Sequence, residues 1–254
     1  MSTQAAVTVA EQGASLFGRV AVVTGAAGAL GRAIVEEFTC RGANVVGVDL
    51  HGDDCVHADI GTAEGNAAMV AAALKRHGRL DILVLNAGAQ HMAPIAEFPE
   101  EQWHRLLDVM LTGPFLAVRA AWPELIRRPG RRILVTASTS SFVAERYKAA
   151  YVAAKHGVLG LMKVAALEGA DHGLTANAVA PSWMRTPMVE DQVADRVRLL
   201  GKPEREVIAA LVGEQAAKRF VEPAEVAATL AFLAGPGASA ITGTCVPVDL
   251  GALA

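Results

Sequence analysis

The sequence predicts an α/β fold: a doubly wound, seven-stranded parallel sheet with helices on both faces. Short apolar runs alternate with longer amphipathic segments along the 254 residues, as they do where helices connect parallel strands. Hydrophobic residues make up 52% of the chain and aromatic residues only 5%, which suits buried strands covered by Ala-rich helices. A Gly-rich turn after the first apolar run is the third observation, because such turns begin the first crossover helix of this architecture.

The first elements form a βαβ unit. Residues 20–24 are an apolar run, and residues 24–31 contain three glycines. Apolar side chains then recur at helical spacing until Gly42 ends the helix. Residues 44–49 are the second buried strand. Strand, turn, helix and strand in this order define the unit.

The alternation continues to the end of the chain. Residues 186–220 are polar and charged, and we expect them to be a lid, because long segments between regular elements often cover a binding site. Residues 1–17 are expected to be a flexible N-terminal leader, and residues 18–254 a single domain. The remaining strands are expected over 55–58, 80–85, 132–137, 174–179 and 245–248, and the remaining helices over about 63–77, 100–126, 149–171 and 223–234.

The charge pattern argues against a nucleic-acid partner. The net charge is −3 and the pI is about 6.2, whereas nucleic-acid binding needs a basic patch. The densest basic cluster surrounds a Pro-Gly pair, and we expect it to be a solvated loop. It consists of Arg127, Arg128, Arg131 and Arg132.

The cysteines indicate neither a metal site nor a disulfide framework. Cys40, Cys55 and Cys245 are odd in number and lack metal-ligand spacing, so a reducing, cytoplasmic location is expected. Residues 1–17 do not have the pattern of a signal peptide. No apolar run is long enough to span a bilayer, so no membrane partner is expected.

The Gly-rich turn predicts a dinucleotide site. Gly25, Gly28 and Gly31 let the backbone approach a pyrophosphate, and the following helix N-terminus favours its charge. Asp49 ends the second strand, where a carboxylate accepts hydrogen bonds from ribose hydroxyls and repels a 2′-phosphate. No Arg or Lys immediately follows Asp49. The predicted cofactor is NAD; the alternative is a structural turn with a strand-end aspartate.

A tyrosine and a lysine early in the 149–171 helix predict acid/base chemistry. Tyr151 and Lys155 are four residues apart and share a helix face. A nearby cation stabilises a phenolate, so the phenol pKa is expected below its usual value of about 10. Ser138, at the end of the fifth strand, can hydrogen-bond a carbonyl oxygen. Four neighbouring hydroxyls compete for that role on composition alone: Thr136, Thr139, Ser140 and Ser141.

Together these features resemble the short-chain dehydrogenase/reductase family over about residues 18–251. The matching motifs are Thr24–Gly31, Asp59-Ile60, Asn86-Ala-Gly88, Ser138, Tyr151/Lys155, Asn177–Pro181, Thr186-Pro187 and Ile241–Gly243. The resemblance implies a Rossmann-type fold, a homotetramer built partly from the 100–126 and 149–171 helices, and an adenine flanked by Asp59 and Ile60. It also implies that Thr186 contacts the nicotinamide amide. The expected cofactor-binding residues are Gly25, Gly28, Leu30, Gly31, Asp49, Asp59, Ile60, Asn86, Ala87, Gly88, Tyr151, Lys155, Pro181 and Thr186.

Within that family, three segments resemble bacterial D-3-hydroxybutyrate dehydrogenases. They are residues 86–99, 147–157 and 186–192. This resemblance implies that Gln90, Lys148 and Gln192 surround a substrate carboxylate, with Trp183 and Ser140 lining the pocket. A cation and two amides can bind a carboxylate by charge-assisted hydrogen bonds. The alternatives are a solvated helix-start lysine, a loop glutamine and a surface glutamine on the lid.

Four positions depart from these patterns. Ala29 replaces the middle glycine of the family turn, and its methyl is expected to crowd a pyrophosphate unless Gly28 beside it lets the turn adjust. Met110 replaces an asparagine that helps hold a water in the proton relay to the lysine, and Met cannot make that hydrogen bond. Ser140 replaces a histidine of the hydroxybutyrate enzymes, and the chain end at 249–254 lacks their terminal Trp. These last two changes favour a larger or less acidic substrate.

Three functions remain open at this stage. The first is an NAD-dependent oxidoreductase acting on a secondary alcohol such as a 3-hydroxy acid, with 3-hydroxybutyrate as one candidate. The second is a ketoreductase of secondary metabolism acting on a bulkier neutral substrate. The third is a non-catalytic nucleotide-binding protein, which only Ala29 and Met110 favour. His91 is a further catalytic candidate, with a polar residue at the pocket rim as its alternative.

Overall fold

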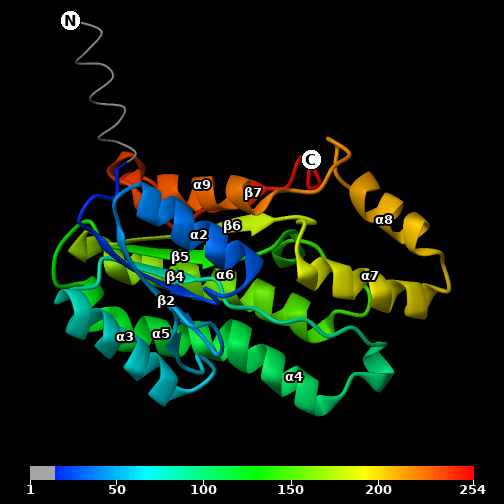
Figure 1. Cartoon of the computed structure of the whole chain (residues 1–254), viewed down its shortest axis with the longest axis horizontal. Helices are drawn as coiled ribbons and strands as arrows, with labels where there is room; N and C mark the ends of the chain where they lie inside the picture. Colours follow the sequence, from blue (N-terminus) through cyan, green and yellow to red (C-terminus); the bar gives the residue numbers. More distant parts are fainter. Residues whose placement is uncertain (1–14) are drawn as a thin grey trace, which may run out of the picture.

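A seven-stranded sheet lies at the centre of the computed structural model, which describes residues 15–254 (Figure 1). Its strands run in the order β3-β2-β1-β4-β5-β6-β7, and every neighbouring pair is parallel. Strand order therefore reverses between β1 and β4, which creates a crevice at the carboxyl ends of these strands. The predicted doubly wound sheet is confirmed.

The strands match their predicted positions to within two residues at either end. The shortest is β3, which pairs with β2 through only two residues. Every side chain of β1 and β4 is buried and all but Thr24 are apolar, as expected of strands covered on both faces. The strands are β1 Val20–Thr24, β2 Asn44–Asp49, β3 Val56–His57, β4 Ile82–Leu85, β5 Arg132–Thr136, β6 Thr175–Pro181 and β7 Cys245–Val248.

Helices cover both faces of the sheet (Figure 1). Their bounds are α2 Ala29–Cys40, α3 Ala63–His77, α4 Glu100–Leu107, α5 Gly113–Leu125, α6 Ala149–Gly169, α7 Pro187–Leu200, α8 Glu204–Gly213 and α9 Pro223–Ala234. Short 3₁₀ turns occupy 95–97, 139–141, 170–172 and 236–238. Helices α2 and α9 pack on one face through residues such as Phe38 and Leu230. Helices α3, α5 and α6 pack on the other through residues such as Met69 and Met162.

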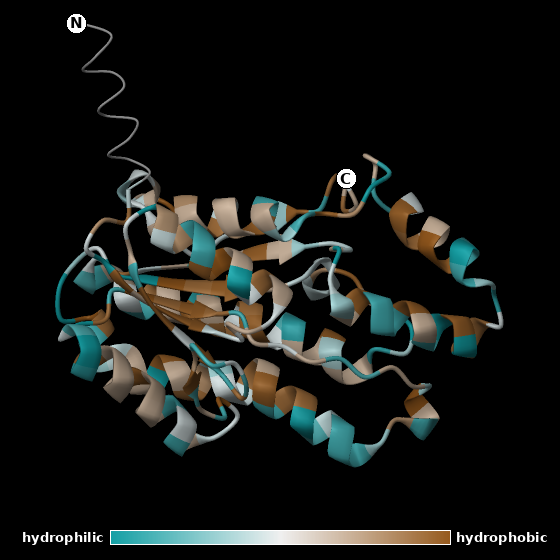
Figure 2. Cartoon of the chain, in the orientation of Figure 1, coloured by the Kyte–Doolittle hydropathy of each residue, from teal (hydrophilic) through white to brown (hydrophobic). Residues whose placement is uncertain are grey.

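Most apolar side chains of the described residues face the interior of the molecule. Figure 2 shows brown strands at the centre and teal patches on the outer sides of the helices. Leu16 is fully buried in the α2 side of the core, and its amide bonds the Arg41 carbonyl at 2.9 Å. The packed fold therefore already includes Leu16, within the expected leader. Residues 1–14 of that leader lie outside the described residues.

A π-helical turn, Asp108–Thr112, interrupts the predicted 100–126 helix and separates α4 from α5. Gly113 follows the turn, and a Cβ there would lie 2.5 Å from the Ile60 carbonyl oxygen. The close approach explains why a residue without a side chain stands at this junction. Such turns bulge a helix and often occur at functional sites.

The basic cluster between α5 and β5 differs from its prediction. Arg127 and Arg128 are exposed, but Arg131 and Arg132 are buried. Arg131 forms an ion pair with the buried Asp81, and Arg132 donates to the Gly235 carbonyl at 3.2 Å. The expectation of a solvated loop is therefore wrong for these two residues, because their partners, the Asp81 carboxylate and the Gly235 carbonyl, lie 50 and 103 positions away in the sequence.

Helix α6 and the turn after it, Ala149–His172, reach the length and mean hydropathy of a membrane span. The sequence-based search for a long apolar run did not single out this segment. Within the fold, 44% of an apolar 18-residue window of this segment is buried, and the helix contacts β6 and α4. A core helix of an α/β protein passes the same test of length and composition, so the segment is accounted for by the packed sheet.

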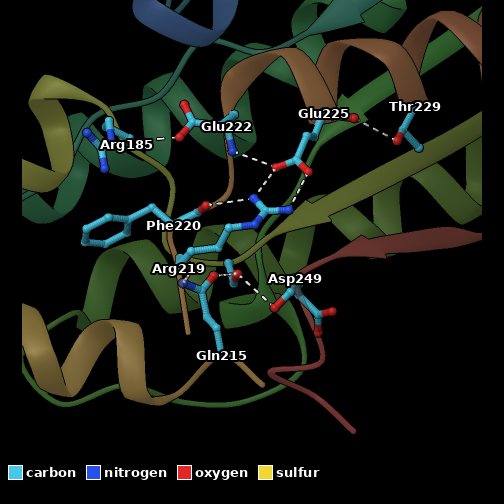
Figure 3. A network of polar contacts seen from close by, with 9 residues as sticks. Arg185, Gln215, Arg219, Phe220, Glu222, Glu225, Thr229 and Asp249 are labelled. Carbon is cyan, nitrogen blue, oxygen red and sulfur yellow. Dashed lines mark hydrogen bonds and ion pairs between the residues drawn. The ribbon is translucent and has the colours of Figure 1, made fainter. Parts of the chain in front are cut away.

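The expected lid contains two helices, α7 and α8 (Figure 1). They form a small core of their own around Trp183, Val193 and Leu211. The chain returns from the lid through a polar network in which Arg219 pairs with Glu225 at 2.7 Å (Figure 3). Glu225 also accepts a hydrogen bond from the Glu222 amide, so this network fixes the start of α9.

Candidate active site

A cavity of about 1140 Å³ opens at the carboxyl ends of the central strands. Ligands of open α/β sheets bind in this position. Every predicted cofactor-binding residue lines the cavity, as do Ser138, Tyr151 and Lys155. Four of the five predicted substrate residues line it as well: Ser140, Lys148, Trp183 and Gln192. The fifth, Gln90, lines a smaller cavity that shares Gln192 with the first.

The glycine turn between β1 and α2 has little room for side chains. Gly25 has a positive φ of 68°, and a Cβ there would lie 2.7 Å from the Ala87 Cα. At Gly31 a Cβ would lie 1.9 Å from the Gly25 carbonyl oxygen. At Gly28 the nearest atom is 3.3 Å away. Ala29 forms the first residue of α2, so the fold accommodates its methyl group.

The amide groups at the start of α2 are available to a ligand. Among the described residues no side chain caps this helix, and the Arg32 amide bonds back to the Gly28 carbonyl at 2.9 Å. The amides of the preceding residues have no partner within the helix, and this turn lines the cavity. Such a terminus suits the negative charge of a pyrophosphate.

The carboxylate of Asp49 is held at the edge of the cavity. Its Oδ2 accepts a hydrogen bond from the Ala27 amide at 3.0 Å, and its Oδ1 accepts one from the Leu50 amide at 2.8 Å. Asp49 therefore fastens the glycine turn, as a structural strand-end aspartate would. It also presents a fixed negative charge to a ligand in the cavity, so the two roles are compatible.

Asn86 joins the ends of three strands. Its Nδ2 donates to the Thr24 carbonyl at 3.0 Å, and its Oδ1 accepts from the Thr136 hydroxyl at 3.1 Å. The Thr24 hydroxyl accepts from the amides of Asn86 and Ala87. The sequence left Thr136 as an alternative to Ser138 for hydrogen-bonding a carbonyl oxygen. In the structure the Thr136 hydroxyl donates to Asn86 instead.

Ser138, Tyr151 and Lys155 meet at the centre of the cavity. Ser138 follows β5, and its side chain shares a hydrogen bond with Tyr151 in the first turn of α6. Lys155 lies one turn further along α6, with its Nζ 5.6 Å from the centre of the Tyr151 ring. That Nζ donates to the Thr136 carbonyl at 2.6 Å. The fold therefore brings together the three residues predicted to be catalytic.

The pKa of Tyr151 differs from the sequence-based expectation. Burial raises it to about 12, and the hydrogen bond with Ser138 lowers it only in part. Burial also lowers the pKa of Lys155 to about 8. The expectation of a phenol pKa lowered by the lysine is wrong for this structure, because burial dominates the pKa of Tyr151. A lysine with a pKa near 8 can exchange protons close to neutral pH.

Met110 belongs to the π-helical turn and is buried. It packs with Leu106, Ala150 and Ala154 between α4 and α6. Its sulfur would lie 3.7 Å from a Cβ on Gly88. An apolar side chain thus fills the place of the asparagine that holds water in the family that the sequence resembles.

We call the part of the cavity around the predicted substrate residues Ser140, Lys148 and Trp183 its substrate end, and the part around the glycine turn its cofactor end. The substrate end contains an acidic residue, Glu145, that the sequence analysis missed. Glu145 pairs with Lys148 at 2.9 Å and with Arg196 of α7 at 3.0 Å, and it accepts a hydrogen bond from the Ser140 hydroxyl. The three-residue spacing of Glu145 and Lys148 could have indicated their pairing. Arg196 lies 51 positions away from Glu145, and local spacing gives no indication of that contact.

Trp183 lies between the two cations of this cluster. The Lys148 Nζ is 4.3 Å and the Arg196 Cζ 4.9 Å from the ring centre, distances at which a cation attracts an indole face. The indole Nε1 donates to Glu214 of the lid at 2.6 Å. Glu214 and Arg196 are therefore further residues of this end that sequence reasoning did not find.

Three remaining polar candidates, Gln192, Gln90 and His91, lie near the substrate end of the cavity. The Gln192 Nε2 donates to the Met188 carbonyl at 3.2 Å, which leaves its Oε1 buried and without a partner among the described residues. The Gln90 Oε1 accepts from the His91 amide at 3.1 Å. The ring of His91 packs edge-on against Phe98, with 5.4 Å between ring centres, and does not line the main cavity. This placement fits a rim residue.

Comparison with known proteins identifies a large group of relatives. The family model described as enoyl-(acyl carrier protein) reductase matches residues 25–252. The chain is 40% identical over 253 residues to the uncharacterized oxidoreductase YxjF of Bacillus subtilis, covering 92% of this chain and 97% of that protein. It is 37% identical over 252 residues to the D-beta-hydroxybutyrate dehydrogenase of Rhizobium meliloti, covering 92% and 98%.

Solved structures with the same architecture include an aldohexose dehydrogenase of Thermoplasma acidophilum. It is 33% identical with a TM-score of 0.87, covering 94% of this chain and 95% of that one. A 3-ketoacyl-(acyl-carrier-protein) reductase of Brucella melitensis, solved in complex with NADH, is 30% identical with a TM-score of 0.83. The match covers 94% of this chain and 99% of that one. The likeness in both sequence and fold extends over almost the whole chain.

Proposed function

This chain belongs to the short-chain dehydrogenase/reductase family of oxidoreductases, and from that premise we propose that it is an NAD-dependent enzyme that interconverts a secondary alcohol and a ketone. The observation that carries the proposal is the meeting of Ser138, Tyr151 and Lys155 in the cavity. These groups can exchange one proton with a substrate oxygen while the carbon atom exchanges a hydride.

In the oxidation, Tyr151 takes the proton of the substrate hydroxyl on its phenolate oxygen, and Ser138 hydrogen-bonds the same substrate oxygen. Bound NAD supplies the acceptor for the hydride, and its positive ring favours the phenolate. Lys155, with a pKa of about 8, passes the proton towards solvent. The reduction reverses each transfer: Tyr151 donates its proton to the ketone oxygen.

The residues at the cofactor end fit a nicotinamide dinucleotide. Three features support this fit: the uncapped amides of α2, the closely packed glycines of the turn before it and the fixed carboxylate of Asp49. The charge of Asp49 favours NAD over NADP, because a 2′-phosphate would face a carboxylate held at the cavity wall. Asp59 and Ile60 line the same region and are proposed to flank the adenine.

The first candidate substrate is a 3-hydroxy acid such as 3-hydroxybutyrate. Relatives named D-beta-hydroxybutyrate dehydrogenase from Rhizobium meliloti and Cupriavidus necator, at 37% and 38% identity, support this candidate. The second candidate is a bulkier neutral substrate, which the small side chain of Ser140 favours. A non-catalytic role would require that the assembled Ser138, Tyr151 and Lys155 serve no reaction.

Membership of this family also leads us to propose that the protein assembles as a homotetramer. Helices α5 and α6 keep large apolar side chains on their outer sides: Phe115, Val164 and Leu167 are between 47% and 79% exposed. Apolar side chains of this size on adjacent helices favour burial against another copy of the chain. Light scattering of the purified protein tests the proposed mass.

The proposed reaction is tested by replacing Tyr151 with Phe. Without the phenol oxygen, kcat for NAD reduction by the best secondary alcohol should fall about 100-fold to 10,000-fold, the usual contribution of acid/base catalysis. NADH binding, followed by its fluorescence, should change little. Tyr147→Phe is the matched control, because it removes a phenol oxygen four residues away outside the cavity lining. Equal activity of Tyr151→Phe and the control would reject the proposed role.

A further inference from the structure

The substrate end of the cavity already contains a carboxylate. Glu145 and Lys148 come from the segment that enters α6, Ser140 from the turn after β5, and Arg196 from the lid helix α7. Three donors surround the Glu145 carboxylate: the Ser140 hydroxyl, the Lys148 Nζ at 2.9 Å and the Arg196 Nη2 at 3.0 Å. These are the kinds of donor that would otherwise hold the carboxylate of an acidic substrate.

This cluster is balanced in charge but only partly buried, since Glu145 is 22% exposed and Glu214 is exposed. The Lys148 side chain is 3% exposed and that of Arg196 14%. Two cations, Lys148 and Arg196, are accompanied by two carboxylates, those of Glu145 and Glu214. Burial opposes ionisation of Glu145, but Lys148, the Ser140 hydrogen bond and Arg196 together lower its pKa. Glu145 is therefore ionised at neutral pH, and a second anion entering here would be uncompensated.

A second acceptor on the cavity wall, the side-chain oxygen of Gln192, lacks a donor among the described residues. Gln192 is only 5% exposed and lines the cavity. Its Nε2 bonds the Met188 carbonyl, and only the nitrogen of an amide can donate to a carbonyl oxygen. The Oε1 must therefore point away from that carbonyl, and it is buried without a partner among the described residues. A buried acceptor without a donor is costly unless a ligand supplies one.

From this arrangement, and resting on the proposed alcohol–ketone activity, we propose that the far end of the substrate is neutral and carries hydroxyl groups, with Glu145 and Gln192 as the acceptors that select it. A hydroxyl both donates to these oxygens and accepts from the nearby Lys148. A carboxylate has no proton to donate and would meet the negative charge of Glu145. An ammonium group would face Lys148 and Arg196.

The inference is tested with two substrates that differ at one carbon. In 3-hydroxybutyrate and 1,3-butanediol the reacting alcohol and the four-carbon chain are the same, but a carboxylate is replaced by a hydroxymethyl group. With both enantiomers of each and NAD, we expect the better kcat/KM for the diol to exceed that for the acid by about tenfold or more, the discrimination typical of a buried hydrogen bond to a charged group. A preference for 3-hydroxybutyrate would overturn the inference and leave the proposed activity intact.

Glu145→Gln removes the charge at nearly constant shape. The diol-to-acid ratio of kcat/KM should then fall by about tenfold or more, mainly through KM, because Lys148 and Arg196 become free for a substrate carboxylate. Glu145→Asp keeps the charge and should keep the preference for the diol. Glu36→Gln, an exposed position on α2, is the matched control. An unchanged ratio in Glu145→Gln would overturn the role of Glu145.

Binding separates this inference from the proposed reaction. Tyr151→Phe with NAD bound can be titrated with the diol or the acid and followed by Trp fluorescence, since Trp183 contacts both cations of the cluster. We expect the diol to bind about tenfold or more tightly than the acid. Tighter binding of the acid would overturn the inference even if no turnover is found. Absence of turnover of any secondary alcohol by the unmodified protein would instead refute the proposed function.

Discussion

The cofactor end and the substrate end of the cavity satisfy their polar groups in different ways. At the cofactor end the backbone dominates: the turn around Gly25 and Gly31 is packed against itself, and Asp49 is held by amides. At the substrate end side chains pair with side chains, as Glu145 does with Lys148 and Arg196.

This difference explains which changes each end can accept. A backbone-built site depends on conformations that only a few residue types adopt, so substitutions there act on folding and on cofactor binding together. A site built from side-chain pairs can exchange partners while the chain path is kept. Specificity for the substrate can therefore change at one end while the cofactor site at the other end is preserved.

The largest expected effect is at the turn of the cofactor end. Gly31→Ala places a methyl group 1.9 Å from the Gly25 carbonyl oxygen, whereas Gly28→Ala meets its nearest atom at 3.3 Å. We expect Gly31→Ala to lower the free energy of unfolding by about 3 kcal/mol or more, and Gly28→Ala to change it by less than about 1 kcal/mol. Urea unfolding measures both. Similar losses in the two variants would show that close packing does not distinguish these glycines.

The second largest expected effect concerns Lys155, which lies between the cofactor end and the substrate end of the cavity. Burial lowers the pKa of Lys155 to about 8 from its usual value of 10.5. The unfolded chain therefore holds this proton at higher pH than the folded chain. Stability contributed by Lys155 is present above pH 10.5 and is lost as the pH falls through 8.

Lys155→Met removes this dependence and should be inactive. At pH 7 the variant should be more stable than the unmodified protein by about 2 kcal/mol, since roughly 3 kcal/mol of charge burial is relieved and about 1 kcal/mol of hydrogen bonding to Thr136 is lost. The difference should shrink as the pH rises from 8 to 10.5. Thermal unfolding across this range measures it, and a difference independent of pH would contradict a buried, charged Lys155.

A third prediction concerns the choice of cofactor. Asp49→Asn keeps the shape and can still accept from the Ala27 amide, but it removes the charge that repels a 2′-phosphate. The ratio of kcat/KM with NADP to that with NAD should rise about tenfold or more, because discrimination by a single close charge is of this order. Asp53→Asn, an exposed change in the same loop, should leave the ratio unchanged. Equal ratios in both variants would argue against Asp49 as the selector.

The same contrast explains how much the sequence could predict. The strands, the glycine turn and the Tyr151/Lys155 pair follow from local periodicity and spacing, and the structure places them where they were expected. The buried pair of Arg131 and Asp81 and the contact of Arg196 with Glu145 join residues about fifty positions apart. No local pattern encodes such pairs. The pKa of Tyr151 was missed because it depends on desolvation, which only the packed structure determines.

The smallest expected effect comes from backbone strain at Tyr147, beside the substrate end of the cavity. Tyr147 has a positive φ of 70°, a conformation in which a side chain meets the neighbouring carbonyl. Its own carbonyl accepts from the Ala93 amide at 3.0 Å, and Lys148 follows it directly. The surrounding contacts therefore hold a strained residue beside the charge cluster, as is common at functional sites.

Tyr147→Gly and Tyr147→Ala measure this strain, because both remove the ring and only one keeps a Cβ. The glycine variant should be the more stable by about 1 kcal/mol, since the relief of strain exceeds the extra freedom that glycine gives the unfolded chain. For a chain of this size the two melting temperatures should differ by about 2–4 °C. A more stable alanine variant would mean that no strain is stored at Tyr147. The position of Lys148 would then depend on its partners Glu145 and Trp183 alone, and even the backbone of the substrate end would follow from side-chain pairing.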